Sequence, residues 1–172
     1  MKKDLLLIID LQKGWRHRTA TEKVMQKTVQ LAQRFKGDVI HSCFKNDPKS
    51  LFYTQLNWSR FSEPRDTDQI PEIAELKLPI YWRNTYNCVT DETLPLFKKY
   101  KHIYIAGVFT DISVHATALC LFDNGIQVSV VKDAICTLHG NDVHSVYLKS
   151  LEMALDRKHV VTSKSLLSKS PE

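Results

Sequence analysis

The sequence predicts an α/β fold, a three-layer α-β-α sandwich around a doubly wound, mostly parallel six-stranded sheet of the Rossmann-like type. Two observations predict it. Short apolar runs rich in β-branched residues alternate with helix-length amphipathic segments along the chain. Within these runs apolarity is continuous rather than alternating, which is typical of strands covered by helices on both faces. No linker or repeat interrupts the pattern, so we expect residues 1–172 to form a single domain.

The expected strands lie at residues 5–9, 39–44, 79–82, 103–106, 127–131 and 159–161. Between the first two strands, Thr19 and Glu22 have the spacing of a capping box, which predicts a helix start. One face of that helix should carry Val24, Thr28, Leu31 and Phe35. Thr90 is the expected cap of a second helix. A third, at 111–123, has apolar residues nearly all round and should be buried, and a fourth covers about 142–157.

The stretch 46–70 is long and aromatic and does not fit this alternation. Loops of such length inside a compact domain are usually functional lids. We therefore expect it to cover a pocket with an aromatic lining, and aromatic walls favour a planar or ring-bearing ligand. The alternative is that its rings form a dimer interface patch. The expected substrate-binding residues are Trp15, Phe52, Trp58, Phe61 and Tyr86.

The composition of the chain limits the kinds of partner that we expect it to bind. The 24 basic and 19 acidic side chains are scattered, so a net charge of +5 indicates a solvated surface rather than a nucleic-acid site. The first apolar run is too short to cross a membrane, and four cysteines without a C-x-x-C pair favour reduced thiols in the cytoplasm. Neither a dinucleotide nor a P-loop motif is present, and the histidines lack ligand spacing. We expect no metal, no cofactor, a small-molecule substrate or ligand, and a homo-oligomer.

Three polar residues fall where ligands bind in such sheets, beyond the carboxyl ends of the strands. Asp10 ends the first strand, Arg83 follows the third, and Ser113 lies in the first turn of the helix after the fourth. Each alone would be an ordinary cap or surface residue. Together they indicate one pocket, where the free N–H groups of the helix start suit an anion or oxyanion.

Five blocks of sequence carry a family resemblance. They are LIIDLQ at 7–12, YWRNTYN at 81–87, AGVFTDISV at 106–114, LFDNG at 121–125 and VKDA at 131–134. Their order and their places at strand ends resemble those of the isochorismatase-like cysteine hydrolases across nearly the whole chain.

The resemblance implies a catalytic triad of Asp, Lys and Cys. Asp10 matches the aspartate, whereas Arg83 stands at the lysine position and Ser113 at the cysteine position. It also implies a non-proline cis peptide bond between Val108 and Phe109, and an oxyanion hole made by the backbone N–H groups of Phe109 and Ser113. The Asp-x-His metal cluster of nicotinamidases is absent after the second strand.

Two functions stay open. In the first, the chain hydrolyses a small carboxylate- or amide-bearing metabolite, with protonated Asp10 as general acid and Arg83 holding a carboxylate. Cysteine-amidase chemistry looks disabled, since a cation and a helix start do not ionise a serine hydroxyl as they do a thiol. In the second, the chain is an inactive family member that serves as a ligand-binding or interaction module. A third possibility is that Cys43 or Cys88 supplies a displaced nucleophile.

Overall fold

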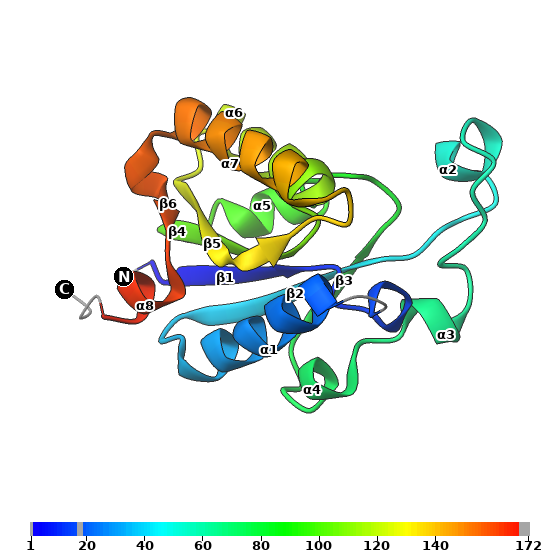
Figure 1. The fold of residues 1–172 in the computed structure, drawn as a ribbon, viewed down its shortest axis with the longest axis horizontal. Coiled ribbons are helices and arrows are strands. Elements are labelled where there is room, and N and C mark those ends of the chain that lie inside the picture. Colours follow the sequence, from blue (N-terminus) through cyan, green and yellow to red (C-terminus); the bar gives the residue numbers. More distant parts are fainter. Residues whose placement is uncertain (1, 17–18, 169–172) are drawn as a thin grey trace.

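The computed structural model describes residues 2–16 and 19–168, and a six-stranded, all-parallel sheet forms the centre of this part (Figure 1). The strand order is β3-β2-β1-β4-β5-β6. The predicted α/β fold is confirmed, with β4 and β5 running further than expected. The strands are β1 (Asp4–Ile9), β2 (Asp38–Phe44), β3 (Ile80–Arg83), β4 (His102–Val108), β5 (Val128–Cys136) and β6 (Val160–Val161).

The strand order reverses between β1 and β4, because the chain builds outward to β3 and then returns to the other side of β1. Leu5 to Ile9 are completely buried, as their continuous apolarity predicts. Gly107 allows β4 to approach β1 closely, since a Cβ there would lie 2.1 Å from the carbonyl oxygen of Ile9. Its φ of +115° is also one that residues with a side chain rarely adopt. This reversal creates the crevice where ligands bind in doubly wound sheets.

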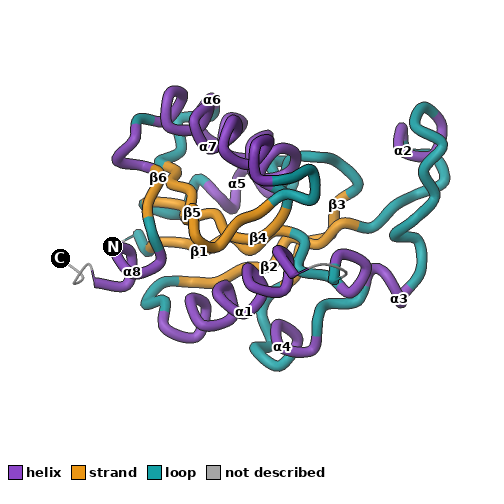
Figure 2. Tube along the Cα trace, in the orientation of Figure 1, coloured by secondary structure: helices purple, strands orange, loops and turns teal. Residues whose placement is uncertain are grey.

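Helices cover both faces of the sheet (Figures 1 and 2). The first face carries α1 (Thr19–Arg34), α4 (Pro71–Ala74) and α8 (Ser163–Ser168). The second carries α5 (Thr93–Phe97), α6 (His115–Asp123) and α7 (Asn141–Leu155). Each face has its own apolar core, as a three-layer sandwich requires. No helix in the part of the chain described above is long and apolar enough to cross a membrane.

One expectation about the helices is confirmed and another needs correction. The first helix, α1, begins at Thr19 as the capping-box spacing predicts, and the carboxylate of Glu22 forms an ion pair with Arg16 at 3.0 Å; the capping hydrogen bonds stay a prediction. The third helix is not buried all round. It begins as a π-helix, Thr110–Val114, continues as α6, and buries one side while Phe122 is 54% exposed. Apolar residues outnumber the positions that face the sheet, so composition alone overstated its burial.

The expected lid, residues 46–70, lies between β2 and β3 and contains the short helices α2 (Leu51–Thr54) and α3 (Pro64–Thr67). Its α2 end projects from the body of the molecule beyond the carboxyl ends of the strands (Figure 2). Its return path is fastened beside β1, where the N–H of Ile70 donates to the carbonyl of Leu11 at 3.2 Å. The lid therefore has internal structure and a fixed base.

Candidate active site

The structure brings Asp10 and Arg83 into direct contact at the carboxyl ends of β1 and β3. The Nη2 group of Arg83 donates to Oδ2 of Asp10 at 2.5 Å. Both side chains are buried, with 3% of Arg83 and 6% of Asp10 exposed. Asp10 turns out of β1 with a φ of +57°, a left-handed conformation that aspartate tolerates better than most residues. The predicted convergence of these two side chains is confirmed.

The guanidinium of Arg83 is held on several sides. Its Nε donates to Sγ of Cys88 at 3.3 Å, and its Nη1 donates to the carbonyl of Thr85 at 2.5 Å. It also lies over the ring of Phe44, 5.7 Å from the ring centroid. A guanidinium has five N–H groups. With three engaged, two remain for a ligand, and the others fix the plane of the group.

Burial raises the pKa of Asp10 above its usual value, although Arg83 and the hydroxyl of Ser113 act in the opposite direction. The two opposing effects were predicted, and the cost of desolvating the carboxylate is the larger. Ser113 is near enough to influence this carboxyl, yet Oδ1 of Asp10 is buried without a well-formed hydrogen bond to any described residue. One oxygen of Asp10 is thus free to carry a proton or accept one.

The end of β4 has the backbone that the resemblance implies, because the peptide bond between Val108 and Phe109 is cis. The carbonyl of Phe109 then accepts from the N–H groups of Ile112 and Val114, both at 3.1 Å, at the start of the π-helix. Ser113 lies within this turn and is buried. The part of the Phe109 and Ser113 N–H groups in an oxyanion hole stays a prediction.

The lid rings join Trp15, as predicted. Phe61 stacks on Trp15 with centroids 4.1 Å apart, and Trp58 lies 6.2 Å away on a nearly parallel plane. Phe52 continues the cluster from Trp58 to Tyr86, which is 4.9 Å from it and half exposed. Phe61 itself is completely buried, so it supports the other rings from below. That these five residues bind a substrate stays a prediction.

Gly14 explains how Phe61 reaches this position. A Cβ at residue 14 would lie 2.5 Å from the ring of Phe61, so only glycine leaves room for the ring. The indole Nε1 of Trp15 is buried and has no partner among the described residues. The aromatic cluster therefore contains one unused hydrogen-bond donor, available to a ligand.

Gln12 connects the lid to the sheet, a role that the sequence did not reveal. Its Nε2 donates to the carbonyls of Phe44 at 2.8 Å and Thr67 at 2.7 Å, and its Oε1 accepts from the N–H of Phe44. Asn46 similarly binds the carbonyls of Trp58 and Arg60 inside the lid. Both amides are buried. Gln12 was visible only as part of a motif, because its partners are backbone groups.

Two contacts at the same edge of the sheet, each with a histidine, were also not predicted from the sequence. Asp111 accepts from Nδ1 of His139 at 2.5 Å, and Thr110 shares a hydrogen bond of 2.9 Å with His144. Burial alone would raise the pKa of Asp111, but hydrogen bonds from Thr137 and His139 hold it below its usual value. Residues 111 and 139 are far apart in sequence, and no pattern indicated the contact.

Cys43 is a poor candidate for a displaced nucleophile. It is completely buried, and burial together with the charge of Asp10 raises the pKa of its thiol far above the usual range. A thiol nucleophile must ionise, so this environment opposes the hypothesis. Cys88 is buried against Arg83, and its role stays open. Within residues 2–16 and 19–168 no three His, Cys, Asp or Glu side chains are grouped to hold a metal ion.

The fold and the site together therefore define the class of protein. It is a doubly wound α/β protein with polar residues gathered at its strand ends. Within that class, the chain belongs to the isochorismatase family, because the model of the isochorismatase domain matches residues 4–164. This range includes every residue of the candidate site. A search of curated proteins finds no match.

Solved structures share the fold. An isochorismatase-like hydrolase from Alkaliphilus metalliredigens has a TM-score of 0.80 and 17% identity, over 95% of this chain and 96% of that one. A nicotinamidase from Bacillus subtilis has a TM-score of 0.75 and 17% identity, over 93% and 99%. A ribonuclease from Caenorhabditis elegans has a TM-score of 0.72 and 17% identity, over 96% and 80%. At such identities the likeness concerns the fold.

Proposed function

We propose that this chain is an isochorismatase-family hydrolase with a divergent triad of Asp10, Arg83 and Ser113, acting on a small carboxylate- or amide-bearing metabolite. The observation that supports it best is the buried pair of Asp10 and Arg83. Burying a carboxyl group and a guanidinium is costly, and a site without a function has no reason to keep the carboxyl group desolvated. Perturbed acids in such positions are candidates for catalysis.

Asp10 is the proposed general acid. Burial raises its pKa, which increases the fraction of the carboxyl that holds a proton near neutral pH. In the hydrolysis of an enol ether, this proton goes to the terminal alkene carbon and leaves an oxocarbenium ion. Water adds to that ion and returns a proton to Asp10, and the hemiketal then releases the alcohol. The two free N–H groups of Arg83 would bind the substrate's carboxylate.

Ser113 is not the proposed nucleophile. Its hydroxyl would need a neighbouring base, and Arg83 is always protonated and cannot serve as one. The proposal instead gives the Ser113 hydroxyl a role in hydrogen bonding to Asp10, whose pKa it influences. No oxyanion forms in this reaction, so the N–H groups of Phe109 and Ser113 would instead donate hydrogen bonds to an oxygen that the substrate already carries.

The aromatic cluster bears on the shape of the substrate. Trp15 and Trp58 have planes only 14° apart, and flat apolar walls favour a planar or ring-bearing molecule. The unpartnered Nε1 of Trp15 adds a donor that would bind an oxygen on such a ring. These features support a small cyclic acid or amide as the substrate class.

One observation favours the alternative, an inactive ligand-binding or interaction module. Arg83 has three acceptors within the protein, one of them Asp10 itself. A pair that is satisfied in this way also fits a structural ion pair at the base of a binding pocket. In that case ligands would bind beside Arg83 without being hydrolysed.

A thermal-shift screen of small carboxylates and amides, followed by chromatography of each stabilising compound, separates the two functions. The variant Asp10→Asn keeps the shape of the side chain and removes the acid. Hydrolysis by the wild type that Asp10→Asn abolishes, while the ligand still stabilises both proteins, supports the proposal. Binding without turnover in either protein supports the module. Turnover that survives Asp10→Asn contradicts the role of Asp10. The expected homo-oligomer is checked separately by analytical ultracentrifugation.

A further inference from the structure

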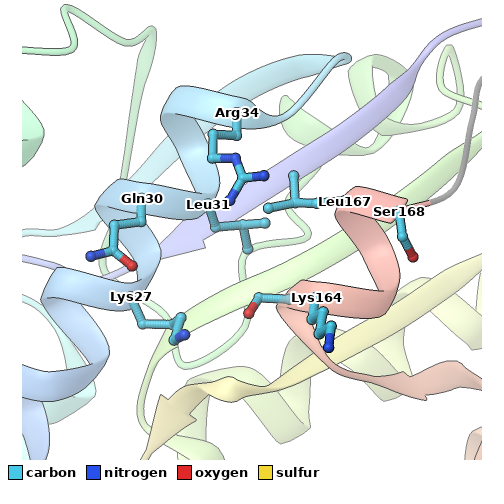
Figure 3. A pocket seen from close by; sticks show the side chains of 8 residues that line it. Lys27, Gln30, Leu31, Arg34, Lys164, Leu167 and Ser168 are labelled. Atoms are coloured by element: carbon cyan, nitrogen blue, oxygen red, sulfur yellow. The ribbon is translucent and has the colours of Figure 1, made fainter.

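A surface groove between α1 and α8 lies away from the candidate active site (Figure 3). Its volume of about 280 Å³ is close to the lower end of the range of small-molecule sites. Leu31 and Leu167 point toward each other across its floor, with Arg34 at one end and Lys27 and Lys164 at the other. The groove therefore joins an apolar floor to a rim of three cations.

Among the residues that the structure describes, these three cations have no acidic partner. Lys27, Arg34 and Lys164 form no ion pair with any residue that the structure describes. Several other lysines on the surface are also unpaired, but these three share one cavity. Like charges gathered in this way repel one another, and an anion in the groove would remove that cost.

The hydrogen-bonding groups beside the groove are also informative. Ser163 lines it, but its N–H and hydroxyl both donate to Asp133, at 2.7 and 2.6 Å. Asp133 thus fastens the start of α8 and is not in an ion pair with any of the three cations. Gln30 adds an exposed amide to the rim. The free donors around the groove are therefore mostly charged.

We propose that this groove binds a small molecule bearing a phosphate group. A phosphate has a charge near −2 and three terminal oxygens, which three cations around one cavity can share. The planar guanidinium of Arg34 suits two of these oxygens, and the lysines act as point charges. A single carboxylate would leave two cations uncompensated. The apolar floor of Leu31 and Leu167 would contact the rest of the molecule.

The test uses inorganic pyrophosphate as the probe, with titration calorimetry and thermal shifts at constant ionic strength. The groove variant combines Lys27→Gln, Arg34→Gln and Lys164→Gln. The control variant combines Lys99→Gln, Lys101→Gln and Lys149→Gln, three exposed lysines elsewhere on the surface that form no ion pair with a described residue. Both variants lose the same charge. We expect pyrophosphate to raise the melting temperature of the wild type and of the control, and to bind the groove variant at least tenfold more weakly.

Further variants and probes keep the binding test decisive if the groove variant folds poorly. Arg34→Lys alone retains the charge but loses the planar fork, and it should weaken binding severalfold. No binding of pyrophosphate to the wild type, or equal weakening in both triple variants, would overturn the site. Equal affinity for citrate would overturn the choice of phosphate. Affinity for single-stranded RNA that grows with its length and disappears in the groove variant would replace the small molecule by a nucleic acid.

Discussion

The substitution Asp10→Ala tests whether the buried pair exists as described. It removes the carboxylate that accepts a hydrogen bond from Arg83, whose side chain is only 3% exposed. Breaking a buried ion pair by removing one partner typically costs about 3–5 kcal/mol, because the other charge stays buried. Here Cys88 and Thr85 still accept from the guanidinium, so we expect a value near the lower limit, about 3 kcal/mol.

Urea unfolding at pH 7, followed by tryptophan fluorescence, measures this loss. With an m-value of about 2 kcal/mol per M, a loss of 3 kcal/mol lowers the midpoint by about 1.5 M. The double variant Asp10→Leu with Arg83→Met is the control. It removes both charges and replaces them with apolar groups, so it should recover most of the stability. A loss below about 1 kcal/mol in Asp10→Ala would show that water reaches Arg83 and would refute the buried pair.

Four further predictions concern the same edge of the sheet. Since the pKa of Asp10 is raised from 3.8 in the folded state, its contribution to stability is greatest below about pH 4 and falls as the pH rises through the folded pKa. The difference in unfolding free energy between wild type and Asp10→Asn, measured from pH 3 to 8, should show this slope, and a flat difference would contradict it. Ser113→Cys with Arg83→Lys should gain detectable amidase activity on at least one small amide, while the wild type shows none; robust wild-type activity that survives Ser113→Ala would point to another nucleophile. Gln12→Ala should lower the free energy of unfolding by about 3 kcal/mol, because it leaves buried backbone groups unpaired. Proteolysis within 46–70 should also accelerate, and cleavage at the wild-type rate would argue against a role of Gln12 in holding the lid to the sheet. Gly107→Ala should yield little folded protein, because its Cβ would meet the carbonyl of Ile9, and a normal circular dichroism melt would exclude that clash.

The sheet could be predicted from the sequence because its strands are buried on both faces and their apolarity is continuous. Leu5 to Ile9 are the clearest case, since all five are completely buried. The start of α1 at Thr19 was also predictable, from the local spacing of Thr19 and Glu22. The ion pair between Arg16 and Glu72 was not, because the two residues are far apart in the sequence and a local pattern cannot indicate a partner from another part of the chain.

The candidate site was predictable to the extent that it depends on strand ends. Asp10 follows β1 and Arg83 ends β3, and these parallel strands are only two positions apart in the sheet, so topology alone brings the two residues close. The contacts of Gln12 were not predictable, because they depend on the path that the lid takes. The same holds for Asp111 and His139, which meet only because residues 137–140 pass beside the π-helix.

The central place of β1 also bears on how the chain is made. One edge of β1 can pair with β2 soon after both leave the ribosome, whereas its other edge must wait for β4, where Asp4 pairs with His102. Until residues 102–108 emerge, the nascent chain presents one unpaired edge of a strand whose residues 5–9 are all apolar, and such an edge is a template for pairing with other chains. Synthesis of the segment between β2 and β4, lid included, sets the duration of that exposure. The rate of translation through residues 46–101 therefore governs the risk that the nascent chain aggregates during synthesis.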